Sequence, residues 1–339
     1  MIKRLFKSLA CLAFILVLTL ALSELAVRLV GYSTIYFYDP IYMPFAENSE
    51  IPFVLKPDMH DVRAHGNIRI NTDHLGLRNM ITGKSYGPKA ANEFRIAVLG
   101  DSVTFGYGVK TEDTYAYVLE QMLNKASSGC KVTVFNFGVS SYSVKEMAAT
   151  LRERAINIDP DLVLVGVIYG DFDIGRTPGL DRDGYNTHSA TSRLFSNYPV
   201  IKSILRNIHL TYAVRDVIGV LKVHSDRKAN AAELPPTYNY LREIKEFADG
   251  KNIPCIMVTL PSLGGDGSEF KPVIDAFRKD QIGYCDLSTL TGAFTTEQFK
   301  ASRFDSYHPS KPVHEKMAAM LKEFISKAYI PQRCAGATE

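Results

Sequence analysis

The sequence predicts an α/β fold in which helices cover both faces of a parallel sheet. Uninterrupted apolar runs of strand length recur between residues 94 and 287, and segments with helical spacing of apolar residues lie between them. Strands that are buried on both faces have this pattern, because helices cover each side of the sheet. Residues able to carry chemistry follow several of these runs, at the carboxyl ends where α/β sheets bind ligands.

The first element is a predicted membrane helix over residues 1–31. Its start carries the basic residues Lys3, Arg4 and Lys7. Residues 8–23 then contain no charged side chain, and a positive flank before about 20 apolar residues is typical of a signal anchor or a secretory signal. Small residues before Glu24 would suit signal cleavage, but the helical apolar pattern continues after it and favours a retained, single-pass anchor. The positive-inside rule then places the bulk of the chain outside the cytoplasm.

The charge balance argues against a nucleic-acid-binding protein. Beyond those three N-terminal residues, 36 basic residues balance 36 acidic ones, whereas binding to phosphates needs a basic face. The chain has 339 residues, of which 46% are hydrophobic and 22% charged. This is ordinary globular composition, with room for one large domain and appendages or for two modest domains.

The remaining elements follow in order. Residues 32–92 predict an extended N-terminal region with one or two short strands, and the regular alternation predicts a domain over residues 93–330. Its strands are expected at residues 94–100, 131–138, 161–169, 253–260 and 283–287, and its helices at 113–127, 144–157, 237–252 and after Pro309. Asp113 is the expected N-cap of the first helix, and Asp159-Pro160 ends the second. Residues 171–234 interrupt the alternation as a long irregular insert.

Ser102 follows the first predicted strand, in the glycine-rich stretch IAVLGDSVTFGYGV of residues 96–109. A serine at this place can be a helix N-cap. A glycine-rich turn can also cradle phosphate, although neither G-x-x-x-x-G-K-[ST] nor G-x-G-x-x-G is present. The third interpretation is a catalytic nucleophile, and the tripeptide Gly-Asp-Ser alone does not decide among the three.

Near the C-terminus, FDSYHPS places Asp305 three residues before His308. A serine hydroxyl needs a base to remove its proton, and a carboxylate must hold the imidazole in the correct tautomer. An Asp and a His three residues apart on a turn can both face one serine. The alternative is that both residues cap the last helix. Together with Ser102 and the strand order, the pattern favours a catalytic triad.

On these residues the sequence resembles the SGNH (GDSL-like) hydrolase superfamily, in its membrane-anchored members. The resemblance covers about residues 93–325 and is carried by GDSVTFGYGVKTEDTYAYVLE, VFNFGVSSYSVKEM and DSYHPS. LSELAVRLVGY and INTDHLGLRN are similar to the N-terminal regions of anchored members. The resemblance implies a flavodoxin-like three-layer sandwich with sheet order 2-1-3-4-5. It also implies that Ser102 is the nucleophile, His308 the general base and Asp305 its orienting carboxylate.

The same resemblance implies an oxyanion hole made by the backbone amides of Ser102 and Gly138. A glycine lets an amide approach the oxyanion without a Cβ in the way, although Gly138 could instead serve only a turn. The family's third donor is an Asn side chain after the third strand, where this chain has Gly170. Losing one oxyanion donor costs about 10²–10³ in kcat. Three explanations are open. A backbone group or a residue of the insert replaces the Asn as donor, the enzyme is slow, or the site no longer catalyses hydrolysis.

Other motifs are weaker. Asp171 and Asp173 form a D-x-D after an apolar strand, as in haloacid-dehalogenase-like phosphatases, but no partner motif follows and a solvated loop pair is the simpler interpretation. Cys255 and Cys285, on two predicted neighbouring strands, could form a disulfide or remain buried thiols. His314 is expected to pack or cap at the last helix. The other histidines that could suggest a metal, His60, His65 and His74, have no familiar ligand spacing.

The sequence therefore predicts a serine-dependent esterase that removes an O-acyl group, acetyl above all, through a seryl-acyl intermediate and without metal or organic cofactor. Its membrane tether and exported orientation suggest a carbohydrate or related ester outside the cytoplasm as the substrate. Two alternatives stay open. One is an O-acyltransferase acting on an envelope glycan, and the other is a catalytically weakened protein that binds glycan or scaffolds an assembly.

Overall fold

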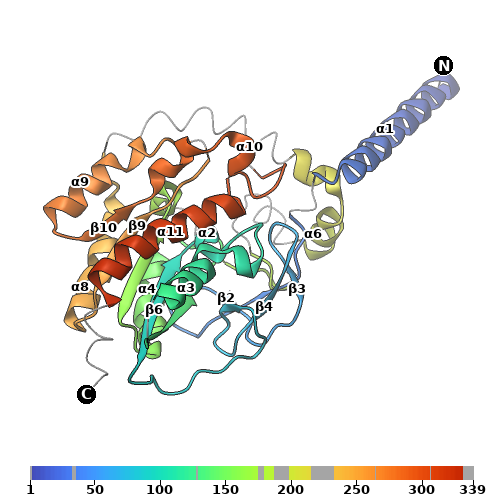
Figure 1. The fold of residues 1–339 in the computed structure, drawn as a ribbon. Coiled ribbons are helices and arrows are strands. Elements are labelled where there is room, and N and C mark those ends of the chain that lie inside the picture. Colours follow the sequence, from blue (N-terminus) through green and yellow to red (C-terminus); the bar gives the residue numbers. More distant parts are fainter. Residues whose placement is uncertain are drawn as a thin grey trace.

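A five-stranded parallel sheet lies at the centre of the structure (Figure 1). The computed structural model describes residues 2–32, 36–126, 129–174, 179–186, 198–214, 233–263, 265–305 and 307–330. The strands are β6 (Glu93–Gly100), β7 (Lys131–Asn136), β8 (Leu162–Val167), β9 (Cys255–Thr259) and β10 (Gly283–Asp286). Their order is β7-β6-β8-β9-β10, which is the predicted order 2-1-3-4-5, and each neighbouring pair is parallel. The predicted fold class is confirmed.

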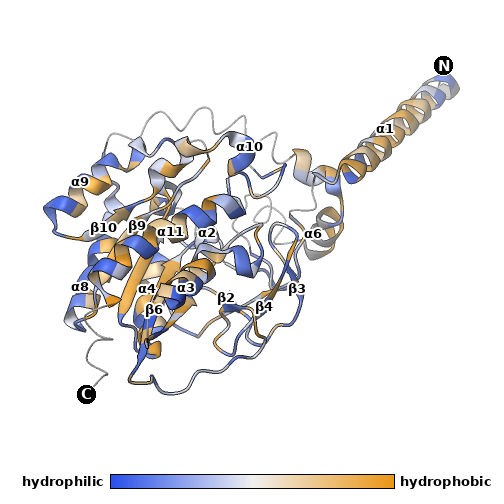
Figure 2. Ribbon diagram, in the orientation of Figure 1, coloured by the Kyte–Doolittle hydropathy of each residue, from blue (hydrophilic) through white to orange (hydrophobic). Residues whose placement is uncertain are grey.

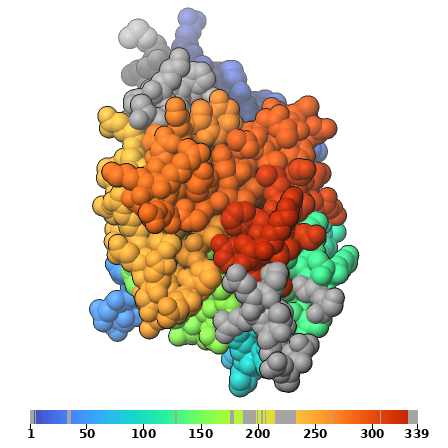
Figure 3. Space-filling model, turned by 60° about the vertical axis from the view of Figure 1, so that its left-hand side comes forward, coloured from blue at the N-terminus to red at the C-terminus, as the bar shows by residue number. Residues whose placement is uncertain are grey.

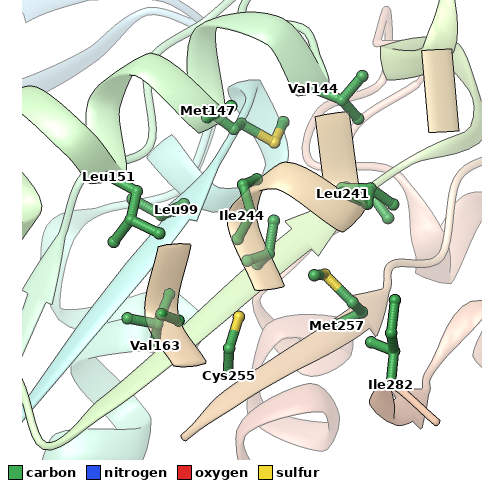
Figure 4. Packing of buried hydrophobic residues seen from close by; sticks show 14 of the residues in the cluster. Leu99, Val144, Met147, Leu151, Val163, Leu241, Ile244, Cys255, Met257 and Ile282 are labelled. Atoms are coloured by element: carbon green, nitrogen blue, oxygen red, sulfur yellow. The ribbon is translucent and has the colours of Figure 1, made fainter. Parts of the chain in front are cut away.

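Helices cover both faces because successive residues of β6 point to opposite sides of the sheet. Ala97 and Leu99 belong to one apolar cluster, Ile96 and Val98 to another, and all four side chains are fully buried. The first face is covered by α4 (Val144–Glu153), α8 (Asn239–Gly250) and α9 (Lys271–Lys279), and the second by α3 (Tyr115–Ala126) and α11 (Lys311–Ala328). Figure 4 shows residues of α4 and α8 pointing toward Leu99 and Val163 in the first cluster.

The last part of the chain lies on the β10 side of the sheet, and the residues of β10 are half-buried. Figure 3 shows the segments from α8 to α11 as one continuous surface on this side of the molecule. The sequence prediction contained α8 and α11 but neither α9 nor the short helix α10 (Thr296–Phe299). α10 has only 4 residues, too few for a clear 3.6-residue period, whereas α9 was missed although Val273, Ile274 and Phe277 have helical spacing and are buried.

The N-terminal region is more structured than predicted. It contains an antiparallel pair, β1 (Tyr42–Met43) with β2 (Val54–Leu55). A second antiparallel sheet consists of β3 (Val62–Ala64), β4 (Ile68–Thr72) and β5 (Arg78–Asn79). Strands of two to five residues have almost no readable alternation, so the sequence underestimates them. The region packs on the main domain through a third apolar cluster that includes Phe53, Phe105 and Tyr142.

A long helix, α1 (Ile2–Val30), precedes this region and extends away from the domain (Figure 1). Within Phe6–Val30, an 18-residue window has a mean hydropathy of 2.4, and none of that window is buried. Figure 2 shows the helix as almost continuously hydrophobic after its first turn. Among the described residues, this is the one helix long and apolar enough to cross a membrane, and a signal sequence has the same properties.

One local prediction is wrong, and one alternative left open by the sequence is decided. The N-cap of α3 is Thr114, whose Oγ1 accepts the Tyr117 amide at 3.3 Å, while the Asp113 carboxylate pairs with Lys311 at 2.8 Å. The carboxylate predicted to cap the helix is therefore used in an ion pair with a lysine distant in the sequence. Cys255 and Cys285 are both free thiols and form no disulfide. Cys130 is disulfide-bonded, and its partner cysteine is not among the described residues. Most of the predicted insert 171–234 also lies outside them.

Candidate active site

Ser102, His308 and Asp305 meet at the carboxyl end of the sheet in one hydrogen-bonded chain. His308 Nε2 is 2.9 Å from Ser102 Oγ. On the other side of the ring, His308 Nδ1 is 2.9 Å from Asp305 Oδ2. These are the distances of real hydrogen bonds. The structure therefore brings together the three residues that the sequence predicts, although about 200 residues separate Ser102 from the other two.

The turn after α10 fixes the Asp305 carboxylate. Its Oδ1 accepts the backbone amides of Tyr307 at 2.8 Å and of His308 at 2.9 Å. Burial of Asp305 by itself raises its pKa, but the charge of His308 and these hydrogen bonds outweigh burial and lower the pKa below its ordinary value of 3.8. A carboxylate held ionised beside Nδ1 keeps a proton on that nitrogen, so that Nε2 faces Ser102 as an acceptor.

Ser102 is the first residue of the short helix α2 (Ser102–Phe105), and its neighbour Asp101 is the N-cap. The Asp101 carboxylate accepts the Val103 amide at 2.9 Å. Asp101, and not Ser102, is therefore the N-cap of this helix. The Ser102 hydroxyl has a second acceptor in Asp101 Oδ2 at 3.1 Å. Burial, acting against several hydrogen bonds and the charge of His308, raises the pKa of Asp101.

Glycines at the strand ends let α2 lie directly on the sheet. A Cβ on Gly100 would lie 2.0 Å from Thr104 Oγ1, and one on Gly138 would lie 2.4 Å from the Phe105 nitrogen. Neither approach is tolerable for a side chain. Thr104 is fixed there by a hydrogen bond of 2.9 Å between its Oγ1 and the Tyr115 hydroxyl. These close approaches set the height of Ser102 above the sheet.

Gly138 differs from its predicted use. Its amide already donates to Asn136 Oδ1 at 2.9 Å, in a buried position. The structure therefore does not leave this amide available to an oxyanion, and the glycine serves the close approach of α2 instead. In the loop that follows, the amides of Val139 and Tyr142 donate to backbone carbonyls. Ser141 has a positive φ of 77°, an unusual conformation for a residue other than glycine.

Gly170 lies in the short helix η4 (Tyr169–Phe172), exposed at the end of β8. A Cβ there would meet only Ile168 Cδ1, at 3.7 Å, so nothing in the described structure excludes a side chain. The neighbouring Asp171 is buried and accepts the Ile168 amide at 2.9 Å. Burial, with the nearby Asp101 charge, raises the pKa of Asp171 well above its ordinary value. Its D-x-D partner Asp173 is exposed.

The chain matches the model of the GDSL-like lipase/acylhydrolase family over residues 96–321, well over half of its 339 residues. The protein belongs to the GDSL-like lipase/acylhydrolase family. Its members are ester hydrolases, which agrees with the serine, histidine and aspartate found together at the strand ends. No match was found among curated proteins.

Solved structures with a similar fold are distant from this GDSL-like protein. A member of the lipolytic G-D-S-L family from Veillonella parvula DSM 2008 is 15% identical, with a TM-score of 0.41 over 69% of this chain and 99% of the other. An acetyl xylan esterase is 10% identical, with a TM-score of 0.44 over 68% and 100%. A two-domain esterase active on acetylated mannans is 15% identical, with a TM-score of 0.44 over 72% and 51%.

The N-terminal region, outside the GDSL-like family match, also contributes to the site. Arg78 of β5 is buried and donates to the carbonyls of Phe105 at 2.9 Å and Gly106 at 2.7 Å, at the end of α2. Burial lowers its pKa to about 9. His65 lies near the ring of Tyr107, which stacks on His308. The sequence analysis gave neither Arg78 nor Tyr107 a role, because no local pattern connects them to a triad.

Three further histidines among the described residues contribute no side chain to the triad. His314 is fully buried, which confirms that it packs at the last helix, but its Nδ1 accepts the Tyr115 amide at 3.1 Å and so caps the start of α3 rather than α11. Burial, aided by the charges of Arg78 and His308, lowers its pKa to about 3. His60 and His74 are exposed. Within the described parts of the chain, no three His, Cys, Asp or Glu side chains are placed to hold a metal ion together.

Proposed function

We propose that this GDSL-like protein is a serine-dependent esterase that removes a short O-acyl group, in particular acetyl, from a carbohydrate or related ester outside the cytoplasm. The observation that carries the proposal is the continuous hydrogen-bonded chain from Asp305 through His308 to Ser102. This chain supplies a nucleophile, a base and a carboxylate that orients the base.

The reaction follows from this geometry. Ser102 Oγ attacks the ester carbonyl while His308 Nε2 takes the hydroxyl proton, and Asp305 stabilises the resulting imidazolium. The tetrahedral intermediate collapses to an acyl-Ser102, and the leaving alcohol receives the proton from His308. Water then attacks the acyl-serine with His308 as base, which releases the carboxylic acid and restores the serine.

The oxyanion needs donors at the strand ends. The Ser102 amide stays our first candidate. For the second, the loop after β7 is a better candidate than Gly138, because the Gly138 amide is already used by Asn136. The left-handed Ser141 turns the chain in this loop, and no hydrogen bond of the described residues uses the amide of Ser140 or Ser141. Gly170 offers at most its backbone amide, so we expect a slower esterase than one with an Asn there.

The proposed acyl group is short, and two cavities of the described residues give no support for a longer one. One cavity of about 190 Å³ is lined by residues of β5 and α3, among them Arg78 and Glu120. Another of about 370 Å³ lies beside α9 and includes Arg278 and Asp286. Neither is lined by a triad residue, so neither offers a tunnel for a long acyl chain from Ser102. Acetyl needs no such tunnel.

The location outside the cytoplasm is supported by two features. The apolar helix α1 follows a basic start and is long enough to anchor the protein. The disulfide at Cys130 is typical of oxidising compartments and rare in the cytoplasm. An anchored esterase in that compartment would meet envelope carbohydrates as acyl-ester substrates.

The test is hydrolysis by the full chain in detergent micelles. We expect turnover of 4-nitrophenyl acetate above that of the decanoate, release of acetate from acetylated xylan or mannan, and loss of both activities in Ser102→Ala. Ser268→Ala, a change at an exposed serine of η6 (Ser268–Phe270), is the matched control and should keep both. Transfer of acetyl to an added sugar in preference to water would instead identify an acyltransferase. A folded chain without either reaction would favour the weakened, glycan-binding alternative.

A further inference from the structure

An aromatic stack connects the N-terminal region to the base of the triad. The Tyr107 ring lies 3.9 Å from the His308 imidazole, centroid to centroid, with an interplanar angle of 10°. The His65 imidazole lies 5.5 Å from the same Tyr107 ring, centroid to centroid, with an interplanar angle of 18°. The three nearly parallel rings come from three separate segments: the turn after β3, the loop after α2 and the turn that carries Asp305.

His65 is fixed tightly in this stack. It is buried, and its Nε2 lies 2.8 Å from the Tyr42 hydroxyl. Tyr38 lies over it with a centroid distance of 3.9 Å. The next residue, Gly66, touches the loop after α2 so closely that a Cβ would lie 2.3 Å from the Gly108 Cα. The backbone of the N-terminal region therefore packs directly against the loop that contains Tyr107.

Arg78 holds the backbone on both sides of Tyr107. Its guanidinium donates to the carbonyls of Phe105, Gly106 and Val109, and to Thr111 Oγ1 at 3.0 Å. Hydrogen bonds from a charged donor are stronger than those between neutral groups. With its backbone fixed by Arg78 and its ring against His65, Tyr107 has little freedom to move away from His308.

The charges around His308 suit an imidazolium that forms during the reaction. Asp305 and Asp101 are the carboxylates that act on it. His65 and His314 are the other titratable rings coupled to it, and burial lowers the pKa of each to about 3. Both are therefore neutral at neutral pH and add no competing positive charge. The face of a tyrosine ring attracts a cation, so Tyr107 favours the protonated state that His308 enters when it takes the Ser102 proton.

We infer that the N-terminal region is a working part of the active site, in which His65 acts through Tyr107 as a positioning residue for the His308 imidazole. The inference deepens the proposed function and rests on it for its catalytic consequence. It assigns a role to a region that lies before the part of the chain matched by the family model. Removing the stack should weaken the base without removing any member of the triad.

The kinetic test compares variants of the full chain in detergent. Tyr107→Leu should lower kcat about tenfold with little change in KM, and should move the acid-side midpoint of the kcat/KM profile down by about half to one pH unit. Tyr107→Phe keeps the ring and should stay within about twofold of wild type. His65→Leu should change kcat and the midpoint in the same direction by a smaller amount. His74→Leu, at an exposed histidine of the same region, is the control.

A spectroscopic test does not depend on turnover. In full chain labelled with ¹³C-histidine, the ring C–H signal of His308 is assigned by its loss in His308→Gln. Stacking on Tyr107 should place this signal upfield. Tyr107→Leu and His65→Leu should move it downfield, and Tyr107→Phe should not. A role confined to stability would lower the melting temperature and leave both the pH midpoint and this signal unchanged.

The two tests separate the inference from the proposed function. An active wild type in which Tyr107→Leu and His65→Leu leave kcat, the acid-side midpoint and the His308 signal unchanged overturns the inference. A wild type without esterase activity whose His308 signal still moves in both variants supports the positioning of His308 and overturns the proposed esterase.

Discussion

Replacing Asp305 by Asn should disable the enzyme through the tautomer of His308 while leaving the fold intact. In the structure, Asp305 Oδ1 accepts two backbone amides, from Tyr307 and His308. An Asn side chain that keeps both bonds must place its oxygen at Oδ1, and its NH₂ group then faces His308 Nδ1. That nitrogen has to become an acceptor, so its proton moves to Nε2. A protonated Nε2 cannot take the proton of Ser102.

The magnitude follows from the cost of escaping this arrangement. Flipping the Asn amide restores a partner for Nδ1–H but exchanges two hydrogen bonds, each worth about 0.5–1.5 kcal/mol, for contacts between donors. The variant therefore has either the wrong tautomer of His308 or a disrupted turn at residue 305. We expect kcat/KM to fall by about 10³–10⁴, or about 4–5.5 kcal/mol of transition-state stabilisation. The Asp305 pKa lies below 3.8, so the wild-type carboxylate stays ionised throughout the assay range.

The assay is hydrolysis of 4-nitrophenyl acetate from pH 5 to 9 by the full chain, with circular dichroism as the measure of folding. The control is Asp173→Asn, which makes the same chemical change at an exposed carboxylate near the strand ends and should keep at least half of the activity. A folded Asp305→Asn that retains more than about a tenth of wild-type kcat/KM would refute this account of the tautomer.

Three further predictions concern other parts of the molecule. Gly170→Asn, which adds a side chain where the structure has room, should raise kcat for acetyl esters about tenfold or more by supplying an oxyanion donor; an unchanged or lower kcat would mean that another group already fills that position. His314→Asn should flatten the pH dependence of stability. The His314 imidazole binds a proton below about pH 6.5 in the unfolded chain but only near pH 3 in the folded chain. Because of this residue, the wild-type free energy of unfolding should fall on acidification between these two pH values by up to about 1.4 kcal/mol per pH unit. Thermal melts measure this slope, and an equal slope in the variant would contradict a neutral, buried His314. Alkylation of the denatured, unreduced chain should modify three of its five cysteines, with all five modified only after reduction, and modification of all five without reductant would contradict the disulfide at Cys130.

The strands, the longer helices and the candidate triad could be predicted because their signals are local, whereas the sheet order was predicted only from the family resemblance. Each buried strand is a continuous apolar run, and each central helix has enough turns to show its period. Asp305 and His308 lie in one turn, so three residues of sequence define most of their geometry. Ser102 stands at a strand end, where parallel α/β sheets place their ligands.

The contacts that refine the site could not be predicted, because they depend on groups distant in sequence. The amide of Gly138 is occupied by a side chain whose orientation follows from packing against α2. Asp113 loses its predicted capping role to an ion pair with Lys311, which lies nearly 200 residues later. The stack of His65, Tyr107 and His308 joins three segments that no spacing rule relates. Side-chain partners of this kind become visible only once the fold has brought the segments together.

The central claim is that Ser102 is a nucleophile activated by His308, and covalent labelling tests it most directly. Full-length protein in detergent is treated with a fluorophosphonate, and the modified residue is located by peptide mass spectrometry. The account predicts one adduct, on Ser102, whose formation slows by at least about a hundredfold in His308→Gln. A folded wild type that gains no adduct, or an adduct on a serine other than Ser102, would contradict it.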